Sequence, residues 1–452
     1  MRPVVGWLAW LPWLASGCAT PPERPADHVV LISIDGLVPE YALDAEAHGV
    51  SMPRLAALRS AGAVADGVIG VYPSLTYPSH TTLVTGVRPA RHGIVSNTAL
   101  DPEAGSERWL FDAREIRART LWEAAREAGL RTGAVSWPVT VGAPIDALFP
   151  ETNQFPRDTS WLELARRQST PGLVDAVVAE LGGFEPDGNR DPRGRDRFAT
   201  AAARLILREQ APALLLVHLV QTDYAQHRHG RGSSEARQAF ENVDAHVGQI
   251  VAAVEASGLR ERTAFVVTGD HGFREVQQVI QPNQALRAAG LLETDGEGRI
   301  TRWRAIAHRS AVRLADPGDA EAAARAAALF ETLAAEHPGV FRVVAREELD
   351  RLGADPRALL FVEPAAGYAV AGGFEADAFV APTDRRGSHG HLPDDPDLHT
   401  GLVMSGAGVR PGVALGTVSL VDVAPSVAWL LGLAMDGIEG SPITPALAGD
   451  GS

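Results

Sequence analysis

The chain has 452 residues, of which 45% are hydrophobic and 21% are charged, as in an ordinary folded protein. This length corresponds to about two or three average domains, or to one large α/β domain with insertions. The chain carries 41 basic and 56 acidic residues, and the net charge of −15 argues against general nucleic-acid binding. All basic residues are arginine, which excludes Schiff-base chemistry, and the single cysteine excludes an intramolecular disulfide or a multi-cysteine metal site.

The N-terminus predicts an exported protein. Arg2 precedes an apolar stretch that is too short to span a membrane, as in a signal peptide. Small residues stand directly before Cys18, an arrangement that resembles the lipobox of bacterial lipoproteins, although an ordinary secretory signal with an incidental cysteine is the alternative. We predict a signal peptide over 1–17, a lipidated tether over 18–27, and a location on the periplasmic side or cell surface, anchored to a bacterial membrane.

Apolar runs predict buried strands, and helical patterns lie between them. The expected strands are 28–34, 132–136, 213–220, 263–268 and 400–405. The expected helices are 53–61, 121–128, 196–209 and 236–257. Continuous apolar strands that alternate with helices are typical of a mostly parallel sheet covered on both faces, so the predicted fold class is α/β.

Two stretches interrupt this alternation. Residues 151–195 are rich in Pro, Gly and Arg and have the composition of an insertion. Residues 273–386 have their own expected strands (309–314, 340–344 and 358–362) and a helix (320–335). We predict a core built from 28–272 and 387–445, with a smaller α+β lobe inserted between its two parts.

Three acids, Asp35, Asp223 and Asp270, follow apolar strands or lie close to their ends. Ligands bind beyond the carboxyl ends of the strands in open parallel sheets, so these acids would meet at one rim. One such acid alone is more typical of a turn or a helix cap. Three of them, each accompanied by glycine or histidine, favour a binding site.

Histidines accompany two of these acids. His227 lies four residues after the second acid, on the same face of a helical turn, and His271 directly follows the third. His389 precedes the last core strand, and His391 competes with it for the same role. Carboxylates and imidazoles without thiolates suit zinc better than calcium or magnesium. Two such groups suggest a two-metal site for phosphoryl transfer, with ions about 4 Å apart.

The densest local motif spans residues 72–86. Pro78 suits the first turn of a helix that continues to about Thr85, and Thr76 would stand just before that helix. There its hydroxyl could meet a phosphate held by the helix N-terminus, and metal coordination could activate it as a nucleophile. Simple helix capping by Thr76 is the alternative.

Together these motifs resemble the type I phosphodiesterase/nucleotide pyrophosphatase branch of the alkaline phosphatase superfamily. In chain order they are IDG with Asp35, YPSLTYPSHTTLVTG with Thr76, HGIVSN at 92–97, the Asp223/His227 pair, GDHGF with Asp270 and His271, and GSHGH with His389. The resemblance covers about residues 27 to 440. It implies an alkaline-phosphatase-like three-layer core with a central mostly parallel sheet, two zinc ions, and a threonine that is transiently phosphorylated or nucleotidylated.

The resemblance also implies a role for each matching residue. One zinc ion would be held by Asp35, Thr76, Asp270 and His271, and the other by Asp223, His227 and His389. Thr76 would attack phosphorus in line with the help of its zinc ion. The other zinc ion would stabilise the leaving oxygen and then activate the water that releases the enzyme-bound ester.

One position departs from the family pattern. Nucleotide-cleaving members have asparagine three residues after the threonine, where this chain has Ser79, and this weakens the expectation of nucleotide substrates more than that of phosphoester cleavage. The Ser79 hydroxyl can still donate a hydrogen bond, although its reach is shorter. Asn97, in HGIVSN, resembles the HGIxxN element of the family, for which a structural role is expected. Ser79 and Asn97 are the two substrate-binding residues that we predict. Trp137 matches a family Trp-Pro pair that packs near the site.

We therefore expect a hydrolase that cleaves a phosphodiester or pyrophosphate bond in a small-molecule substrate. A phosphomonoesterase or phosphonate hydrolase on the same core is the first alternative. A lipoprotein that binds ligands without catalysis is the second, and the presence of the complete set of matching residues weighs against it.

Overall fold

The computed structural model describes residues 24–448 except for 103–105, 153–159, 296–298 and 375–376. The predicted signal peptide and Cys18 lie outside these described residues. Within the described part of the chain, no helix is both long and apolar enough to cross a membrane.

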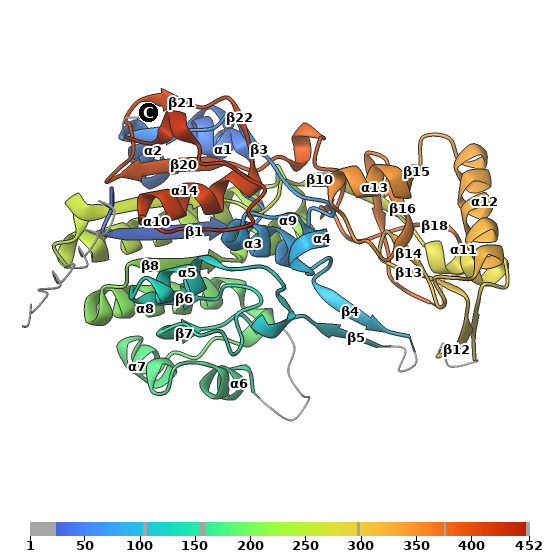
Figure 1. Cartoon of the computed structure of the whole chain (residues 1–452), viewed down its shortest axis with the longest axis horizontal. Coiled ribbons are helices and arrows are strands. Elements are labelled where there is room, and N and C mark those ends of the chain that lie inside the picture. Colours follow the sequence, from blue (N-terminus) through green and yellow to red (C-terminus); the bar gives the residue numbers. More distant parts are fainter. Residues whose placement is uncertain (1–23, 103–105, 153–159, 296–298, 375–376, 449–452) are drawn as a thin grey trace, which may run out of the picture.

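An eight-stranded sheet forms the centre of the larger part of the molecule (Figure 1). In spatial order its strands are β21 (Val413–Ala414), β2 (Gly62–Val64), β20 (Leu402–Gly406), β9 (Thr263–Thr268), β1 (His28–Ile34), β8 (Leu214–Leu219), β6 (Thr132–Val135) and β7 (Ala147–Phe149). Only β20 runs against the other strands of this sheet. The predicted mostly parallel α/β sheet is confirmed.

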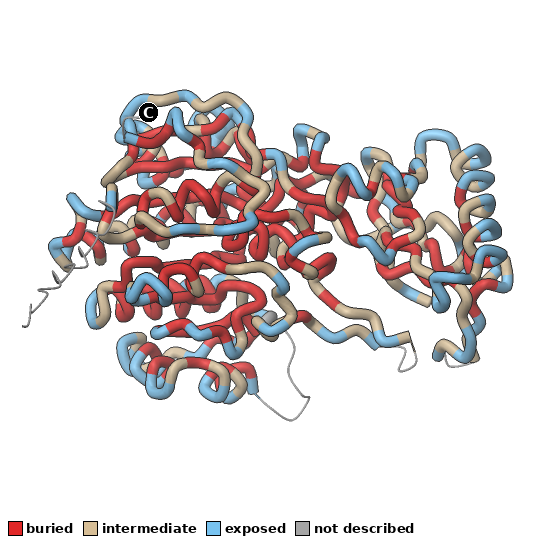
Figure 2. The backbone as a smooth tube through the Cα atoms, in the orientation of Figure 1, coloured by how far each residue is buried: buried red, intermediate tan, exposed pale blue. Residues whose placement is uncertain are grey.

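Helices cover both faces of this sheet because successive residues of its strands point to opposite sides. In β1, Val30 and Ile32 belong to one hydrophobic cluster, whereas Val29 and Leu31 belong to the other. The first face is covered by α1 (Pro39–Asp44), α2 (Pro53–Ser60), α8 (Pro192–Gln210) and α10 (Ser234–Ala256), and the second by α3 (Thr76–Thr85), α5 (Leu121–Glu127) and α14 (Val423–Leu430). Figure 2 shows these buried layers, which confirm the expected three-layer core.

The segment 151–195 contributes to the core. It contains α6 (Trp161–Gln168) and α7 (Leu173–Glu180), and Val174 and Val177 of α7 join the cluster on the first face. Helix α8 begins at Pro192, before the predicted start at 196, because the Asp191 carboxylate accepts a hydrogen bond from the Gly194 N–H at 2.8 Å and caps the helix.

Residues 274–382, between β9 and β20, form a smaller lobe with its own hydrophobic cluster (Figure 1, right). Its strands are β10 (Arg274–Ile280), β11 (Leu292–Thr294), β12 (Ile300–Trp303), β13 (Ala305–His308), β14 (Ala311–Leu314), β15 (Phe341–Ala345), β16 (Ala358–Pro364), β17 (Gly367–Val370) and β18 (Val380–Pro382). Its helices are α11 (Pro282–Ala288), α12 (Ala320–Glu336) and α13 (Arg346–Leu352). Strands β13, β14, β16 and β15 pair antiparallel, and α12 packs against this sheet.

Two connections join the core to this lobe. The short strand β19 (Gly387–Ser388) pairs with β10 on the way back to the core. The hairpin of β4 (Thr98–Asp101) and β5 (Ser106–Trp109) extends from the core toward the lobe (Figure 1). Leu100 of this hairpin packs against the hydrophobic cluster of the lobe. The remaining elements are α4 (Pro89–His92), α9 (Gln221–His229), and the strand pair β3 (Gly67–Ile69) and β22 (Thr417–Ser419).

The topology brings four chain segments to one rim of the sheet. Strand β1 lies between β8 and β9 and is parallel to both, with Ile34 opposite Leu219 and Ser33 opposite Thr268. The residues that follow these three strands therefore emerge side by side. Because β20 runs in the reverse direction, the loop that precedes it starts from the same rim.

Candidate active site

The first cluster at this rim consists of Asp35, Asp270 and His271, whose ligand atoms all lie within 4.8 Å of one another. The His271 Nε2 atom is 3.4 Å from Asp35 Oδ1 and 3.1 Å from Asp270 Oδ2. All three atoms are buried, and none has a hydrogen-bond partner. Buried polar atoms are normally satisfied, so three unsatisfied atoms that converge on one point fit a bound cation.

The second cluster consists of Asp223, His227 and His389. Asp223 and His227 lie one turn apart on α9, and His227 Nε2 is 3.1 Å from Asp223 Oδ1. His389 comes from the loop before β20, and its Nε2 is 3.5 Å from the same Asp223 oxygen. His391, which competed with His389 in the sequence analysis, does not belong to this cluster. It is buried and lines the cavity that Asp223, His227 and His389 also line.

Backbone carbonyls fix the orientation of the three clustered imidazoles. The Nδ1 atoms of His227, His271 and His389 lie 2.8, 3.1 and 2.9 Å from the carbonyl oxygens of Gly387, Gly272 and Ser74. At His227, Nδ1 also lies 2.7 Å from the Arg385 guanidinium, which only donates, so the Gly387 carbonyl does not by itself fix the tautomer of this ring. At His271 and His389 the carbonyl oxygen only accepts, so Nδ1 donates and Nε2 faces the ligand atoms of its cluster. This is the arrangement of histidines that bind metals through Nε2.

The two clusters are adjacent. The rings of His271 and His389 stack with 3.5 Å between their centroids and an angle of 11° between their planes. Residues of both clusters line one cavity together with Thr76. The donors of this cavity are carboxylates and imidazoles with no thiolate, which suits a pair of borderline divalent ions.

Burial perturbs the charges in both clusters. The pKa of Asp35 is held well above its usual value by burial and by the neighbouring carboxylate of Asp270. Burial and the nearby His271 and His227 lower the pKa of the His389 imidazole well below its usual value, so this ring is neutral. A divalent cation bound beside Asp35 and Asp270 would offset the repulsion between these carboxylates and favour their ionised forms.

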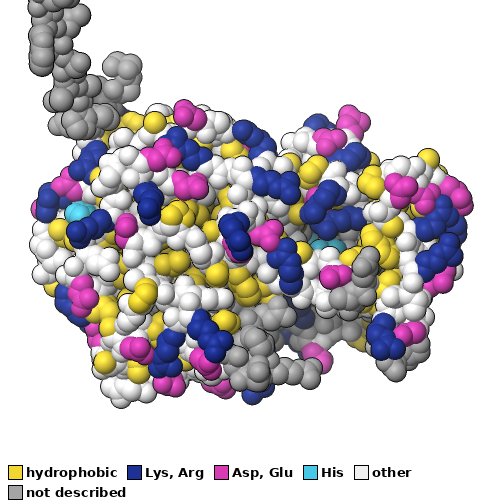
Figure 3. Space-filling model, turned by 60° about the horizontal axis from the view of Figure 1, so that its bottom comes forward, with side chains coloured by type: hydrophobic (Ala, Val, Ile, Leu, Met, Phe, Trp, Pro, Cys, Tyr) yellow, Lys and Arg dark blue, Asp and Glu magenta, His cyan; other side chains and the backbone are white. Residues whose placement is uncertain are grey.

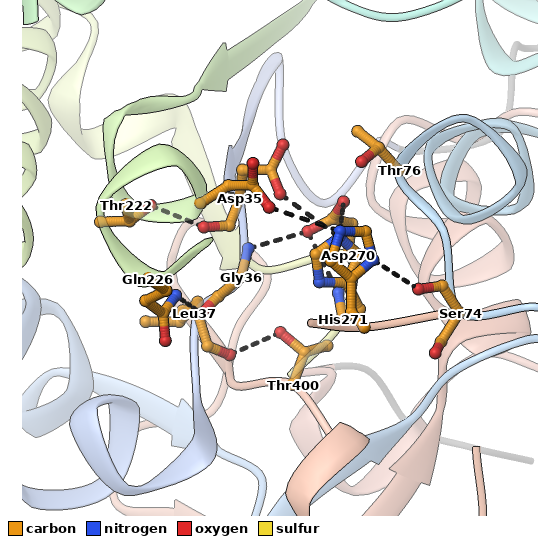
Figure 4. Close-up of polar contacts among 12 residues, drawn as sticks. Asp35, Gly36, Leu37, Ser74, Thr76, Thr222, Gln226, Asp270, His271 and Thr400 are labelled. Carbon is orange, nitrogen blue, oxygen red and sulfur yellow. Dashed lines mark hydrogen bonds and ion pairs between the residues drawn. The ribbon is translucent and has the colours of Figure 1, made fainter. Parts of the chain in front are cut away.

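Thr76 is the first residue of α3, whereas the sequence predicts it just before the helix. Thr76 and Asp35 line the same cavity, and in Figure 4 the Thr76 hydroxyl points toward the side where Asp35 lies. The Asn97 Oδ1 atom accepts a hydrogen bond from the Tyr77 N–H at 2.9 Å, and Asn97 lines the cavity. Ser79, in contrast, is fully buried and is not among the residues that line the cavity.

Further buried residues brace the site, and we had no sequence expectation for them. The His218 Nε2 atom, within β8, lies 3.0 Å from Asp35 Oδ2. The His80 ring lies 4.2 Å from the His218 ring at a tilt of 57° and packs edge-on against Trp137, which agrees with the expected packing of Trp137 near the site. The Asp196 carboxylate accepts hydrogen bonds from backbone N–H groups at the start of α9, at 2.7 and 3.0 Å. His218 has a sequence signal, as a polar residue within the apolar run 213–220, whereas His80 and Asp196 lie among other polar residues.

The lobe provides the other wall of the cavity. His308, Arg309 and Arg385 line it together with the aromatic side chains of Trp109 and Phe361. In Figure 3, histidine is visible in the hollow between the two parts of the molecule, next to basic side chains. The cavity therefore has two clusters of possible metal ligands on the core side, and arginine and aromatic side chains on the opposite side.

Comparison with known proteins agrees with this geometry. Residues 29–391 match the family model "Type I phosphodiesterase / nucleotide pyrophosphatase". The human ectonucleotide pyrophosphatase/phosphodiesterase family member 1 is 24% identical over 58% of this chain and 25% of its own length. A Caenorhabditis elegans ectonucleotide pyrophosphatase/phosphodiesterase, C27A7.3, is 27% identical over 62% of this chain and 32% of its own length. This chain thus spans about a quarter to a third of these relatives.

Solved structures share the fold. Human ectonucleotide pyrophosphatase/phosphodiesterase 5 aligns over 93% of this chain and 100% of its own, with a TM-score of 0.66 and 20% identity. An inactive variant of the murine protein, in complex with AMP, aligns over the same shares with a TM-score of 0.65 and 19% identity. The family model covers far more than half of the sequence, and this chain belongs to the type I phosphodiesterase/nucleotide pyrophosphatase family.

Proposed function

We propose that this chain hydrolyses a phosphodiester or pyrophosphate bond through nucleophilic attack by Thr76, with two zinc ions bound at the two clusters. One observation carries the proposal: two adjacent sets of convergent ligand atoms lie at one cavity that Thr76 also lines, and the three atoms of the first set and Asp223 Oδ1 have no hydrogen-bond partner. Family membership supports phosphodiester hydrolysis, and the donor set supports zinc.

Each part of the site has a definite task in this proposal. Asp35, Asp270 and His271 would hold one ion and Asp223, His227 and His389 the other, and the ions would supply the charge that activates a hydroxyl and neutralises a transferring phosphoryl group. The N-terminus of α3 orients the phosphoryl oxygens, because its dipole and free N–H groups favour anions. Thr76 at this position is placed for attack.

Asn97 has the geometry of a phosphate-binding residue. Its carbonyl oxygen accepts the Tyr77 N–H, so the amide is fixed and its NH₂ group remains to donate to a phosphoryl oxygen. Ser79 is too deeply buried to serve in this way. The lost family asparagine at position 79 therefore weighs little against nucleotide substrates.

The comparisons support a nucleotide or related phosphoester as the substrate. The inactive murine variant is in complex with AMP, and the names of the relatives describe nucleotide pyrophosphatases. Those names also describe ectoenzymes, which supports the proposal that this chain is exported and held at a bacterial membrane through lipidated Cys18. Cys18→Ala should then release the protein from the membrane fraction, and unchanged membrane association would contradict lipidation.

A comparison of bis-p-nitrophenyl phosphate with p-nitrophenyl phosphate, run with added zinc, tests the reaction. We expect faster turnover of the diester and a fall of kcat by at least about 10³-fold in Thr76→Ala, with zinc binding retained. Thr301→Ala, an exposed threonine of β12, serves as the matched control. Faster monoester cleavage would favour a phosphomonoesterase, and unchanged activity of Thr76→Ala would remove this residue from the mechanism.

A further inference from the structure

The lobe inserts a tight hairpin into the wall of the active-site cavity. Strands β13 and β14 pair antiparallel from Ala305 opposite Leu314 to His308 opposite Ala311, so Arg309 and Ser310 form a two-residue turn. Both turn residues line the cavity that contains the two clusters. An arginine from the lobe thereby lines the same cavity as Thr76 and residues of both clusters.

The backbone at this turn is unfavourable for arginine. Arg309 has a φ of 52°, in the left-handed region that residues with a Cβ atom adopt at a cost. Two-residue hairpins usually place glycine, asparagine or aspartate in this conformation. Strained residues of this kind concentrate at functional sites, where a function of the side chain offsets the cost of the backbone conformation. The positive φ therefore indicates a function for the Arg309 guanidinium.

The Arg309 guanidinium lacks a close anionic partner. Its Nε atom is buried and has no hydrogen-bond partner, and no carboxylate of the described residues lies within 4.0 Å of it. Arg313, which also lines the cavity, is by contrast paired with the buried Asp355. Arg309 therefore brings positive charge into the cavity without local neutralisation at contact distance.

A second guanidinium lines the same cavity. Arg385, in the segment that returns from the lobe, lies against the His227 ring, with Nη2 2.7 and 2.8 Å from the two ring nitrogens. The two positive charges repel each other, and although the Asp223 carboxylate partly offsets this at Arg385, a bound anion would stabilise both guanidinium groups. Arginine recognises phosphate particularly well, because its planar fork matches two phosphate oxygens.

Contacts with the core hold the hairpin in position. Thr98 Oγ1 donates a hydrogen bond to Glu107 Oε2 at 2.7 Å, and the same hydroxyl lies 3.0 Å from His308 Nε2. Thr98 and Glu107 belong to the β4–β5 hairpin of the core, whereas His308 directly precedes Arg309. This clasp, formed by Thr98, Glu107 and His308, ties the arginine to the wall of the cavity.

We propose that Arg309, together with Arg385, forms a phosphate subsite that binds a second phosphate group of the substrate, beyond the phosphate that Thr76 attacks. This rests on the proposed function and narrows it. The preferred substrates would be nucleoside polyphosphates, in which a pyrophosphate bond is cleaved, rather than diesters with a single negative charge.

Two thymidine compounds that differ in the second phosphate provide the test. The p-nitrophenyl ester of thymidine 5′-monophosphate has one phosphate, and thymidine 5′-triphosphate has additional ones. In Arg309→Ala the ratio of kcat/KM for the triphosphate to kcat/KM for the ester should fall about ten-fold, mainly through KM of the triphosphate. Arg309→Lys should restore part of the ratio. Arg302→Ala, at an exposed arginine of the same lobe, should leave the ratio unchanged.

Thermal unfolding of Arg309→Gly separates binding from structure. Glycine adopts positive φ without strain, so this variant should lose the preference for the triphosphate while its Tm stays equal or rises. A clear fall in Tm would mean that the arginine is retained for structure and would overturn the proposal. Equal loss of activity on both substrates in Arg309→Ala would also overturn it.

The same assays distinguish a failure of the phosphate subsite from a failure of the proposed function. If the wild type cleaves the ester through Thr76 and the Arg309→Ala ratio does not change, only the phosphate subsite is wrong. If the wild type cleaves neither compound, the proposed function is wrong and the subsite falls with it.

Discussion

The two walls of the cavity are built in opposite ways. On the core side, Asp270 and His271 are fully buried, and each clustered imidazole is oriented by a backbone carbonyl. On the lobe side, Arg309 and Arg385 are only partly buried, and the Arg309 backbone is strained. The difference teaches that the proposed metal chemistry would rest on fully buried side chains at the rim of the sheet, whereas the proposed choice of substrate would rest on partly buried side chains of the lobe.

The largest expected effect on kcat/KM is that of replacing Asn97, the proposed phosphate-binding residue on the core side. Asn97→Ala should lower kcat/KM about 100-fold, because the amide is fixed for donation by its bond to the Tyr77 N–H. Ser79→Ala is the control and should change kcat/KM less than about three-fold, since Ser79 lies beneath the cavity lining. Steady-state kinetics on a diester decides, and a larger loss in the serine variant would contradict the assignment.

The bracing of the first cluster leads to the next prediction. His218→Ala should weaken zinc binding about ten-fold, because Asp35 loses the buried partner 3.0 Å from its Oδ2. Competition with a chelator measures the affinity. His246→Ala removes an imidazole that contacts Thr200 away from the clusters and should leave the affinity unchanged. Equal zinc affinities in the wild type and His218→Ala would show that zinc binding by the first cluster does not depend on the contact between His218 and Asp35.

Asp196 gives a pH dependence of stability. Burial raises the pKa of this carboxyl to about 7, above about 3.9 for an unfolded aspartate. The folded state therefore binds more protons between these values, and its stability falls as pH rises through this window. Relative to Asp196→Asn, the wild type should lose about 1–2 kcal/mol of unfolding free energy from about pH 5 to about pH 8. Urea unfolding at both pH values tests this, and a constant difference would contradict it.

The smallest expected effect lies on the lobe side. Glu107→Gln weakens the clasp between the β4–β5 hairpin and His308, and it should raise KM about two- to five-fold with little change in kcat. Glu331→Gln, an exposed glutamate of α12, is the control. A fall of kcat without a change of KM would mean that the lobe takes part in the chemistry. It would contradict the assignment of chemistry to the core side and of substrate binding to the lobe side.

The sequence was sufficient for those parts of the molecule that depend on local pattern. The apolar runs at 28–34 and 263–268 form β1 and β9 with the expected bounds, because each run is largely apolar and is followed directly by Asp35 or Gly269. Asp35 and Asp270 then meet because their strands are adjacent and parallel. The six clustered residues were all expected to converge, although their roles as ligands remain predictions.

The remaining features depend on contacts between residues that are far apart in the sequence. His218 reads as one more position in an apolar strand until β8 pairs with β1 and places it beneath Asp35. The positive φ of Arg309 arises from the pairing of β13 with β14, and no local pattern indicates it. Segment 151–195 has the composition of an insertion, yet Val174 and Val177 pack into the core cluster.

The central claim is that each cluster binds its own divalent ion. Metal analysis of the purified protein after dialysis against zinc should find about two zinc ions per chain. The double variant Asp223→Ala/His227→Ala should keep about one, because the cluster of Asp35, Asp270 and His271 remains intact. A wild type that binds no zinc, or a double variant that still binds two, would contradict the account.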